Sequence, residues 1–431
     1  MVGYPNTYAT DYPPPHLHHF RHMKLILLLL PTLPCAAAMH MMPMHGMYGT
    51  YPMEQDATGT SWAPASTQMP MILRMPDDWL LMTQANMMVI YDNQGGPRGG
   101  EKIFSENMFM FTAQKDVGKS TFGLRSMISL EPATIGCNGY PLLLQTGETC
   151  NGKTPLVNRQ HPHDFLMELA AVYTLRFKET NSIFAYFGYP GEPALGPPAF
   201  INRFSAFFNP EAPITHHWLD STHVTFGVAT LGYIHDWFKL DASIFTGREP
   251  DQHRWNFDRP RFNSYSARVS INPTKNIAAQ VSYGYLESPE QLEPNVNTQK
   301  ITASISYNKA WEKNNWQTTA AWGQNRNSPG HILNGYLLES AIEIRSRHVL
   351  FGRSEYVAKD DLLRQISKVY DVGKIDLGYI FEFPLIPYTR WGLGLAGSAS
   401  FVPHAIKQAY GGTPLSYMAF LRVELIDIPR S

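Results

Sequence analysis

Apolar and polar side chains alternate along segments of about ten residues, mostly in the second half of the chain. In NIAAQVSYGY (276–285), Ile277, Val281 and Tyr283 fall on one face, whereas Gln280 and Ser282 fall on the other. The same alternation occurs at 265–272, 299–308, 374–383 and 417–425. Successive side chains of a strand point to opposite faces, so each segment is predicted to be a strand with one apolar and one polar side.

The connections between these segments alternate between short and long. Short connections fall at 116–120, 178–181, 235–238, 272–276, 311–315 and 346–348, and long loops fall at 131–163, 188–222, 248–262, 287–298, 359–369 and 402–415. A soluble β-sandwich produces the same alternation of faces. Short turns on one rim and long loops on the other, with segments long enough to cross a bilayer, instead favour a transmembrane antiparallel β-barrel.

The segments between Trp79 and Leu425 predict about sixteen strands, with fourteen to eighteen as the range. An even number places both ends of the barrel chain on the short-turn rim. Two segments are ambiguous, because 165–177 is compatible with a helix and 224–233 has almost no polar face. The Pro-rich loop at 188–222 is predicted to fold back as a constriction or a lid.

The polar faces, which would line the lumen, carry both signs of charge. These residues are Lys239, Asp241, Arg268, Lys300, Glu339, Glu343, Arg345, Lys374, Asp376, Arg390, Arg422 and Glu424. Cross-strand ion pairs that stiffen the wall are the preferred interpretation. A weakly charge-selective pore is the alternative, since a strongly selective pore would show one sign.

The start of the chain has the pattern of a targeting segment. Lys24, the apolar run 25–30 and the alanines at 36–38 follow the order of a secretory signal peptide. We therefore predict four parts and export to a Gram-negative outer membrane. The parts are an upstream extension at 1–22, a signal peptide at 23–38, a Met-rich periplasmic segment at 39–78 and an outer-membrane barrel at 79–431.

Charge and location together suggest the partners. The chain has 35 basic and 36 acidic residues, and this near-neutral balance argues against a nucleic-acid partner. Outer-membrane lipid is the expected partner, and a small solute or a metal ion is the expected cargo.

The predicted mature chain begins with MHMMPMHGM (39–47), which holds five methionines and two histidines in nine residues. Thioethers and imidazoles suit Cu(I), and Pro43 and Gly46 oppose a helix. The candidate ligands are Met39, His40, Met41, Met42, Met44, His45 and Met47. We predict a flexible segment on the periplasmic rim that binds copper; a leader without function is the alternative.

Three loops on the opposite rim concentrate histidines and carboxylates. They contain RQHPHD (159–164), THHWLDSTH (215–223) and REPDQHR (248–254), and their candidate metal ligands are His161, His163, His216, His217, Asp220, His223 and His253. Such groups bind zinc, copper or nickel, so we expect them to gather at the extracellular mouth. A hydrogen-bonded network that holds the loops together is the alternative.

The cysteines and the catalytic motifs complete the candidate chemistry. Cys137 and Cys150 remain after the signal peptide, and in an exported chain they are predicted to form a disulfide. No G-x-S-x-G elbow, phosphate-binding loop or H-E-x-x-H helix is present in the sequence. The chain is therefore not predicted to be an enzyme, and an outer-membrane hydrolase is the weaker alternative.

Several longer motifs carry a family resemblance. They are GTSWAPAS (59–66), NQGGPRGG (93–100), RQHPHDF (159–165), GYPGEPALGPPAF (188–200), NPEAPITHHWLDSTHVTFG (209–227) and GREPDQHR (247–254). With them the chain resembles a proteobacterial family of outer-membrane β-barrels grouped with heavy-metal or copper resistance proteins. The resemblance implies a channel or metal-handling barrel, with copper as the candidate cofactor. A channel for small hydrophobic or polar solutes without a metal role is the alternative.

Overall fold

The computed structural model describes residues 44–363 and 368–427 of the 431-residue chain. The strands are β1 (Ile72–Arg74), β2 (Trp79–Gln94), β3 (Gly100–Val117), β4 (Ser120–Ile128), β5 (Tyr140–Thr149), β6 (Pro155–Gln160), β7 (Leu166–Lys178), β8 (Asn181–Gly188), β9 (Val228–His235), β10 (Phe238–Phe245), β11 (Ser264–Thr274), β12 (Ile277–Leu286), β13 (Asn297–Trp311), β14 (Asn314–Ser328), β15 (Ile332–Ile344), β16 (His348–Lys359), β17 (Tyr370–Pro384), β18 (Thr389–Phe401) and β19 (Leu415–Leu425).

The helical turns are short. They are η1 (Met53–Gln55), α1 (Glu131–Thr134), η2 (Phe200–Asn202), α2 (His216–Leu219), η3 (Ser221–His223), η4 (His404–Ile406) and α3 (Lys407–Tyr410). Within the described ranges, none of the helices is long and apolar enough to span a bilayer. The predicted signal peptide and the candidate ligands Met39, His40, Met41 and Met42 lie outside the described residues.

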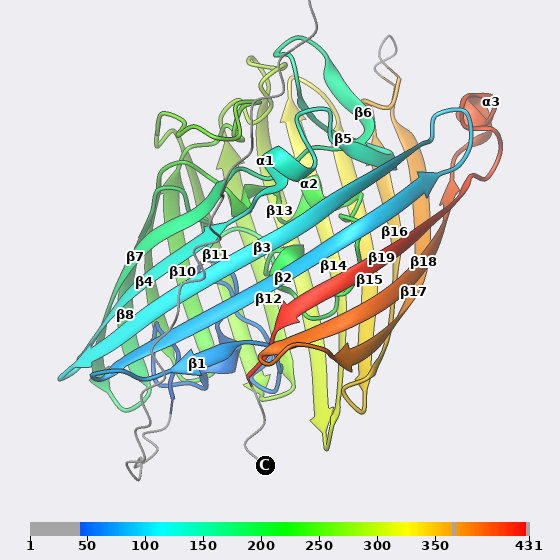
Figure 1. The fold of residues 1–431 in the computed structure, drawn as a ribbon. Coiled ribbons are helices and arrows are strands. Elements are labelled where there is room, and N and C mark those ends of the chain that lie inside the picture. Colours follow the sequence, from blue (N-terminus) through cyan, green and yellow to red (C-terminus); the bar gives the residue numbers. More distant parts are fainter. Residues whose placement is uncertain (1–43, 364–367, 428–431) are drawn as a thin grey trace, which may run out of the picture. The chain divides into compact units, whose positions relative to one another are not determined.

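The strands β2 to β4 and β7 to β19 form a closed antiparallel barrel of sixteen strands (Figure 1). Each strand pairs with the next, and β19 pairs with β2 from Ser416↔Gln94 to Glu424↔Asn86, which closes the ring. β5 and β6 form a separate hairpin, so β4 pairs directly with β7. The predicted transmembrane barrel, its sixteen strands and its limits at Trp79 and Leu425 are confirmed.

The alternation of faces follows the sequence pattern. On β11, Val269 is 40% exposed on the outer surface, whereas its neighbour Arg268 is 1% exposed in the lumen. Val281 and Ser282 repeat this contrast on β12. An apolar outer surface matches the hydrocarbon of a bilayer, because lipid offers no partner for polar side chains.

The two ambiguous segments resolve in different ways. Residues 166–178 form strand β7 and not a helix. β9 begins only at Val228, because the preceding residues belong to the long loop, where Thr225 forms an isolated bridge with Gly191. Both ends of the barrel chain and the short turns share one rim, and the β5–β6 hairpin lies at the other, long-loop rim (Figure 1).

Residues 44–71 lie inside the barrel, toward the short-turn rim. Their backbone carbonyls accept hydrogen bonds from inward-facing side chains, such as Arg125 to Ala57 (2.9 Å) and Thr174 to Met47 (2.9 Å). The Sδ of Met47 fits over Gly123, where a Cβ would lie only 2.5 Å away. The expectation of a flexible segment on the rim is therefore wrong from Met44 onward, because polar groups of the wall bind this stretch.

The long loop between β8 and β9 also fills the lumen, as the sequence predicted. Arg203 forms an ion pair with Glu339 of β15, and Glu211 forms one with Lys374 of β17 at 2.7 Å. Trp218 packs over Gly323 of β14, where a Cβ would lie 2.3 Å from its carbonyl oxygen. These contacts fix the loop across the width of the barrel.

The lumenal charges pair with each other and with this loop. Arg268 and Asp241 are register partners joined at 2.8 Å, as the cross-strand interpretation predicted. Lys374 pairs with the loop instead, because Glu211 reaches it there. Arg345 is not lumenal: it lies exposed, at a φ of 54°, in the turn after β15.

Candidate metal centre in the loops of the barrel

Five histidines gather at the long-loop side of the lumen. His161 and His163 lie just before β7, His216 and His217 lie on α2, and His223 ends η3. The ring centroids are 5.1 Å apart for His216–His223, 5.2 Å for His163–His223, 5.6 Å for His216–His217 and 6.3 Å for His161–His217. The sequence predicts that all three loops gather, and the third loop also makes contact, because Arg254 pairs with Asp164 at 2.9 Å. We call these five residues the histidine cluster.

Three rings of the cluster are oriented by a hydrogen bond at Nδ1. The Nδ1 of His216 bonds to Asp220 (2.7 Å), and that of His163 bonds to Glu131 (2.8 Å). The Nδ1 of His223 bonds to the backbone carbonyl of Asp220 (2.8 Å). Metal-binding histidines usually hold one ring nitrogen in this way, which directs the other nitrogen at the ion.

Several nitrogens of the cluster are buried without a hydrogen-bond partner. They are Nδ1 of His161, Nε2 of His217 and Nε2 of His223. An unsatisfied buried polar atom costs free energy, so native proteins rarely keep one without a role. His161 also approaches the backbone closely, since a Cβ on Gly147 would lie 2.7 Å from its Nδ1.

Burial favours the neutral form of His161, His217 and His223. It lowers the pKa of His217 to about 4 and that of His223 to about 3, with nearby His216 acting in the same direction. The pKa of Asp220 is also lowered: burial would raise it, but the hydrogen bond and charge of His216, together with the charges of Arg203 and His223, outweigh that effect. Neutral imidazoles beside an ionised carboxylate are the state in which a metal binds.

The cluster is not a closed coordination site in this conformation. Among residues 44–363 and 368–427, only Glu148, Glu249 and Glu290 bring three ligand atoms of His, Cys, Asp or Glu within 4.8 Å of one another. The imidazoles would have to rotate to reach a single ion. The cluster has the side chains that bind a metal and the hydrogen-bond partners that orient them, but its nitrogens are not yet placed around one ion.

Two other candidate ligands, His253 and His45, lie outside the histidine cluster. His253 is exposed in the loop after β10, where its Nε2 contacts Gln252, so its side chain lies apart from the five rings although its loop contacts theirs. His45 lies at the opposite rim, bonded to Asp116 (2.7 Å) and close to Arg176 (2.6 Å).

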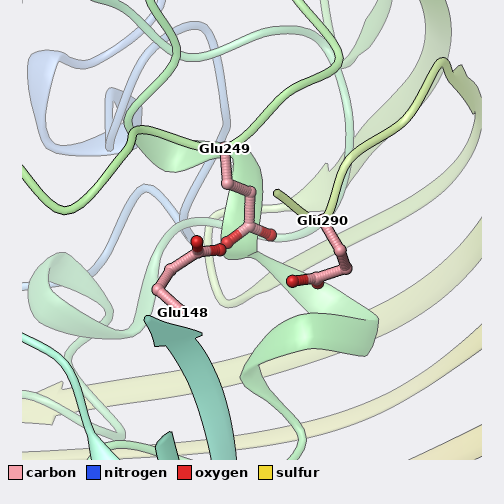
Figure 2. A group of neighbouring side chains, drawn as sticks. All are labelled: Glu148, Glu249 and Glu290. Atoms are coloured by element: carbon pink, nitrogen blue, oxygen red, sulfur yellow. The ribbon is translucent and has the colours of Figure 1, made fainter. Parts of the chain in front are cut away.

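The three glutamates form a carboxylate group that the sequence analysis did not single out. Figure 2 shows Glu148 of β5, Glu249 and Glu290 pointing toward one another from three separate segments. Burial raises the pKa of Glu148, and it raises that of Glu290 to about 8, with Glu249 adding to both. Oxygen ligands of this kind suit hard cations. One residue of a strand and one from each of two loops have no spacing that a sequence pattern could reveal.

The glutamates line a cavity of about 330 Å³ that also contacts His217. The hairpin that carries Glu148 is joined by the disulfide Cys137–Cys150, as predicted. A much smaller cavity of about 50 Å³ lies beside His161 and His163. The histidine cluster therefore contacts a wide space at the mouth and a narrow one within the lumen.

Comparison with known proteins defines the class of fold. No family model and no curated protein matches the chain. Among solved structures, OmpF of Salmonella typhi, in complex with daunomycin, is 8% identical, with a TM-score of 0.51 over 82% of this chain and 100% of that one. OprB of Pseudomonas putida is 9% identical, with a TM-score of 0.48 over 81% of this chain and 94% of that one.

A third similar structure is a loop-deletion variant of OmpT, an outer membrane protein of Vibrio cholerae. It is 8% identical, with a TM-score of 0.48 over 81% of this chain and all of that one. The chain thus has the fold of outer-membrane β-barrels of the porin type. The resemblance to a copper-resistance family stays a prediction.

Proposed function

We propose that the protein is a gated outer-membrane channel for a small solute or a metal ion, held closed by the loop between β8 and β9 and by residues 44–71. The observation that carries this proposal is the burial of the lumenal charges. Lys239, Arg268 and Arg422 are at most 1% exposed, whereas an open pore would leave such side chains in water. The apolar outer surface and the barrel fold support the location.

Single-channel recording in planar bilayers tests the gate. The wild-type protein is expected to conduct weakly, because the loop between β8 and β9 and residues 44–71 fill the lumen. Replacing both loop anchors, Arg203→Gln with Glu211→Gln, should release the loop and raise the conductance several-fold. Glu312→Gln removes one exposed charge in the turn between β13 and β14, away from the loop and its anchors, and should leave the conductance unchanged. A wide, steady conductance that is equal in all three proteins would contradict the gate.

We also propose that the histidine cluster binds a transition metal, with copper as the expected ion. Three observations favour this second role: five imidazoles converge, three of them are oriented at Nδ1, and three ring nitrogens are buried without partners. A purely structural network would pair those nitrogens with protein groups or with ordered water. Nitrogen ligands of this kind accept Cu(II), Zn(II) or Ni(II).

Metal titration of the refolded protein tests this role. The double variant His216→Ala, His217→Ala should lose the bound Cu(II), because it removes two adjacent ligands. His253→Ala is the matched control, since this histidine is exposed and outside the cluster. Equal Cu(II) content in the double variant and the wild type would leave a hydrogen-bonded network as the role of the cluster.

A further inference from the structure

Methionines surround a small cavity between residues 44–71 and the wall of the barrel. The cavity has a volume of about 40 Å³, and its lining includes Met47, Met53, Met69, Met71, Met82 and Met110. The chain has only 19 methionines among 431 residues, so six around one cavity is a strong concentration. Four come from the lumenal segment, and Met82 and Met110 come from β2 and β3.

These methionines come together through tertiary structure and not through one motif. Met82 and Met110 face inward on neighbouring strands, where Gln84 is the register partner of Met110. Met47 is fixed because the backbone N–H of Met47 bonds to Asp56 (2.6 Å) and its carbonyl accepts from Thr174 (2.9 Å). The predicted copper-binding stretch 39–47 therefore contributes Met47 to the lumen, beside thioethers that are distant in sequence.

We propose that this cavity binds a soft monovalent metal ion of the Cu(I) class. Thioethers are soft ligands that select Cu(I), and they need no deprotonation to bind it. This inference rests on the proposed metal-handling function, but it uses residues separate from the histidine cluster. The competing explanation is that the methionines only fill an irregular gap, which their flexible side chains do well.

The charges around the cavity are compatible with a cation. Glu54 and Asp56 line it, together with one guanidinium, that of Arg125. The charge of Arg125 is already paired, because its Nε bonds to Glu168 at 3.0 Å. The two carboxylates therefore leave the surroundings of the cavity without a net positive charge that would repel a monovalent cation.

The six methionines around the cavity differ in how far they are buried. Met47 and Met110 are each 3% exposed, whereas Met53, Met69, Met71 and Met82 are only partly buried. Four of the six side chains are therefore in partial contact with solvent.

Thioethers continue from this cavity toward the histidine cluster. Met108 lies two residues from Met110 on the inner face of β3, and it lines the cavity beside His161 and His163 with Met88 and Met167. Two residues along a strand span roughly 7 Å. The lumen thus offers thioether ligands at both cavities, which lie next to each other along β3.

Cu(I) titration of the full-length refolded protein, against a competing chelator and under reducing conditions, tests the proposal. The triple variant Met53→Leu, Met69→Leu, Met82→Leu keeps side-chain volume while removing three thioethers. It should bind one Cu(I) fewer than the wild type, or bind it at least ten-fold more weakly. Met75→Leu with Met87→Leu is the matched control, since these methionines are exposed, and it should behave as the wild type.

Two further measurements keep the outcome unambiguous. X-ray absorption at the copper edge should show sulfur neighbours in the wild type and fewer of them in the triple variant. The double variant His216→Ala, His217→Ala should keep the sulfur-bound ion even if the cluster proves to bind no metal. Circular dichroism and heat-dependent mobility on gels establish that each variant is folded. Unchanged Cu(I) stoichiometry and affinity in a folded triple variant would overturn the proposal.

Discussion

Single residues in the lumen carry charges and imidazoles that water no longer reaches. Asp241 shows how this is tolerated, because it accepts hydrogen bonds from both Arg268 (2.8 Å) and Thr60 (2.6 Å). Removing one partner of such a group leaves the other charged and buried, which typically costs about 3–5 kcal/mol. The histidine cluster shows the opposite solution, because burial favours the neutral form of His161, His217 and His223.

This neutral state predicts a pH dependence for the metal-free protein. Burial lowers the pKa of His217 to about 4 and that of His223 to about 3, whereas an unfolded histidine titrates at about 6.5. Between these values the unfolded chain binds protons that the folded chain does not. The stability of the loop should therefore be constant above pH of about 6.5 and fall as the pH decreases below it.

Hydrogen exchange of the loop between β8 and β9, measured at pH 7 and at pH 4.5 and corrected for the intrinsic rates, checks this expectation. Exchange should be faster at the lower pH. In a His217→Gln, His223→Gln variant the difference between the two conditions should shrink. Equal protection of the wild-type loop at both pH values would contradict the neutral, buried state of the rings.

At the scale of elements, the long loop fits against the strands because glycines leave space on the inner wall of the barrel. Trp218 covers Gly323 of β14 and Gly335 of β15, and Leu195 covers Gly284 of β12. A strand of a barrel normally projects a side chain inward at every second position. Omitting the side chain at these places lets the loop lie directly on the wall.

The variant Gly323→Ala tests this docking. Its Cβ would lie 2.3 Å from the carbonyl oxygen of Trp218, so backbone must move and α2 should shift away from the wall. We expect a destabilisation of about 1–3 kcal/mol, and a change in tryptophan fluorescence. Gly397→Ala is the control, because the nearest atom there is 3.8 Å away. Identical unfolding curves for both variants and the wild type would contradict the role of Gly323.

The elements also show where sequence patterns suffice. A strand with one side toward lipid and one toward the lumen must alternate, so period two along β11, β12 and β13 identified the wall before its structure was known. Histidines in two loops of the same rim could be predicted to meet. The position of residues 44–71 could not, because its partners are polar side chains of the wall, and a segment rich in Met, Gly and Pro shows no period.

The whole molecule combines an apolar outer surface with a lumen that is filled from both rims. Export must come first, since only a membrane can cover the outer surface. We expect the protein to be recovered in the outer-membrane fraction with an amino terminus near Met39. Amino-terminal sequencing of that fraction checks both points. A soluble periplasmic protein, or an uncleaved start at Met1, would contradict the predicted signal peptide.

The lumenal placement of residues 44–71 has a consequence for the order of folding. Thr60 lies 181 residues from Asp241 and 208 from Arg268, and Thr67 lies 250 residues from Gln317. Contacts between such distant residues form slowly, because the intervening chain must first be ordered. Residues 44–71 are synthesised before the barrel strands, yet they reach their final position only after the strands up to β14 have been laid down.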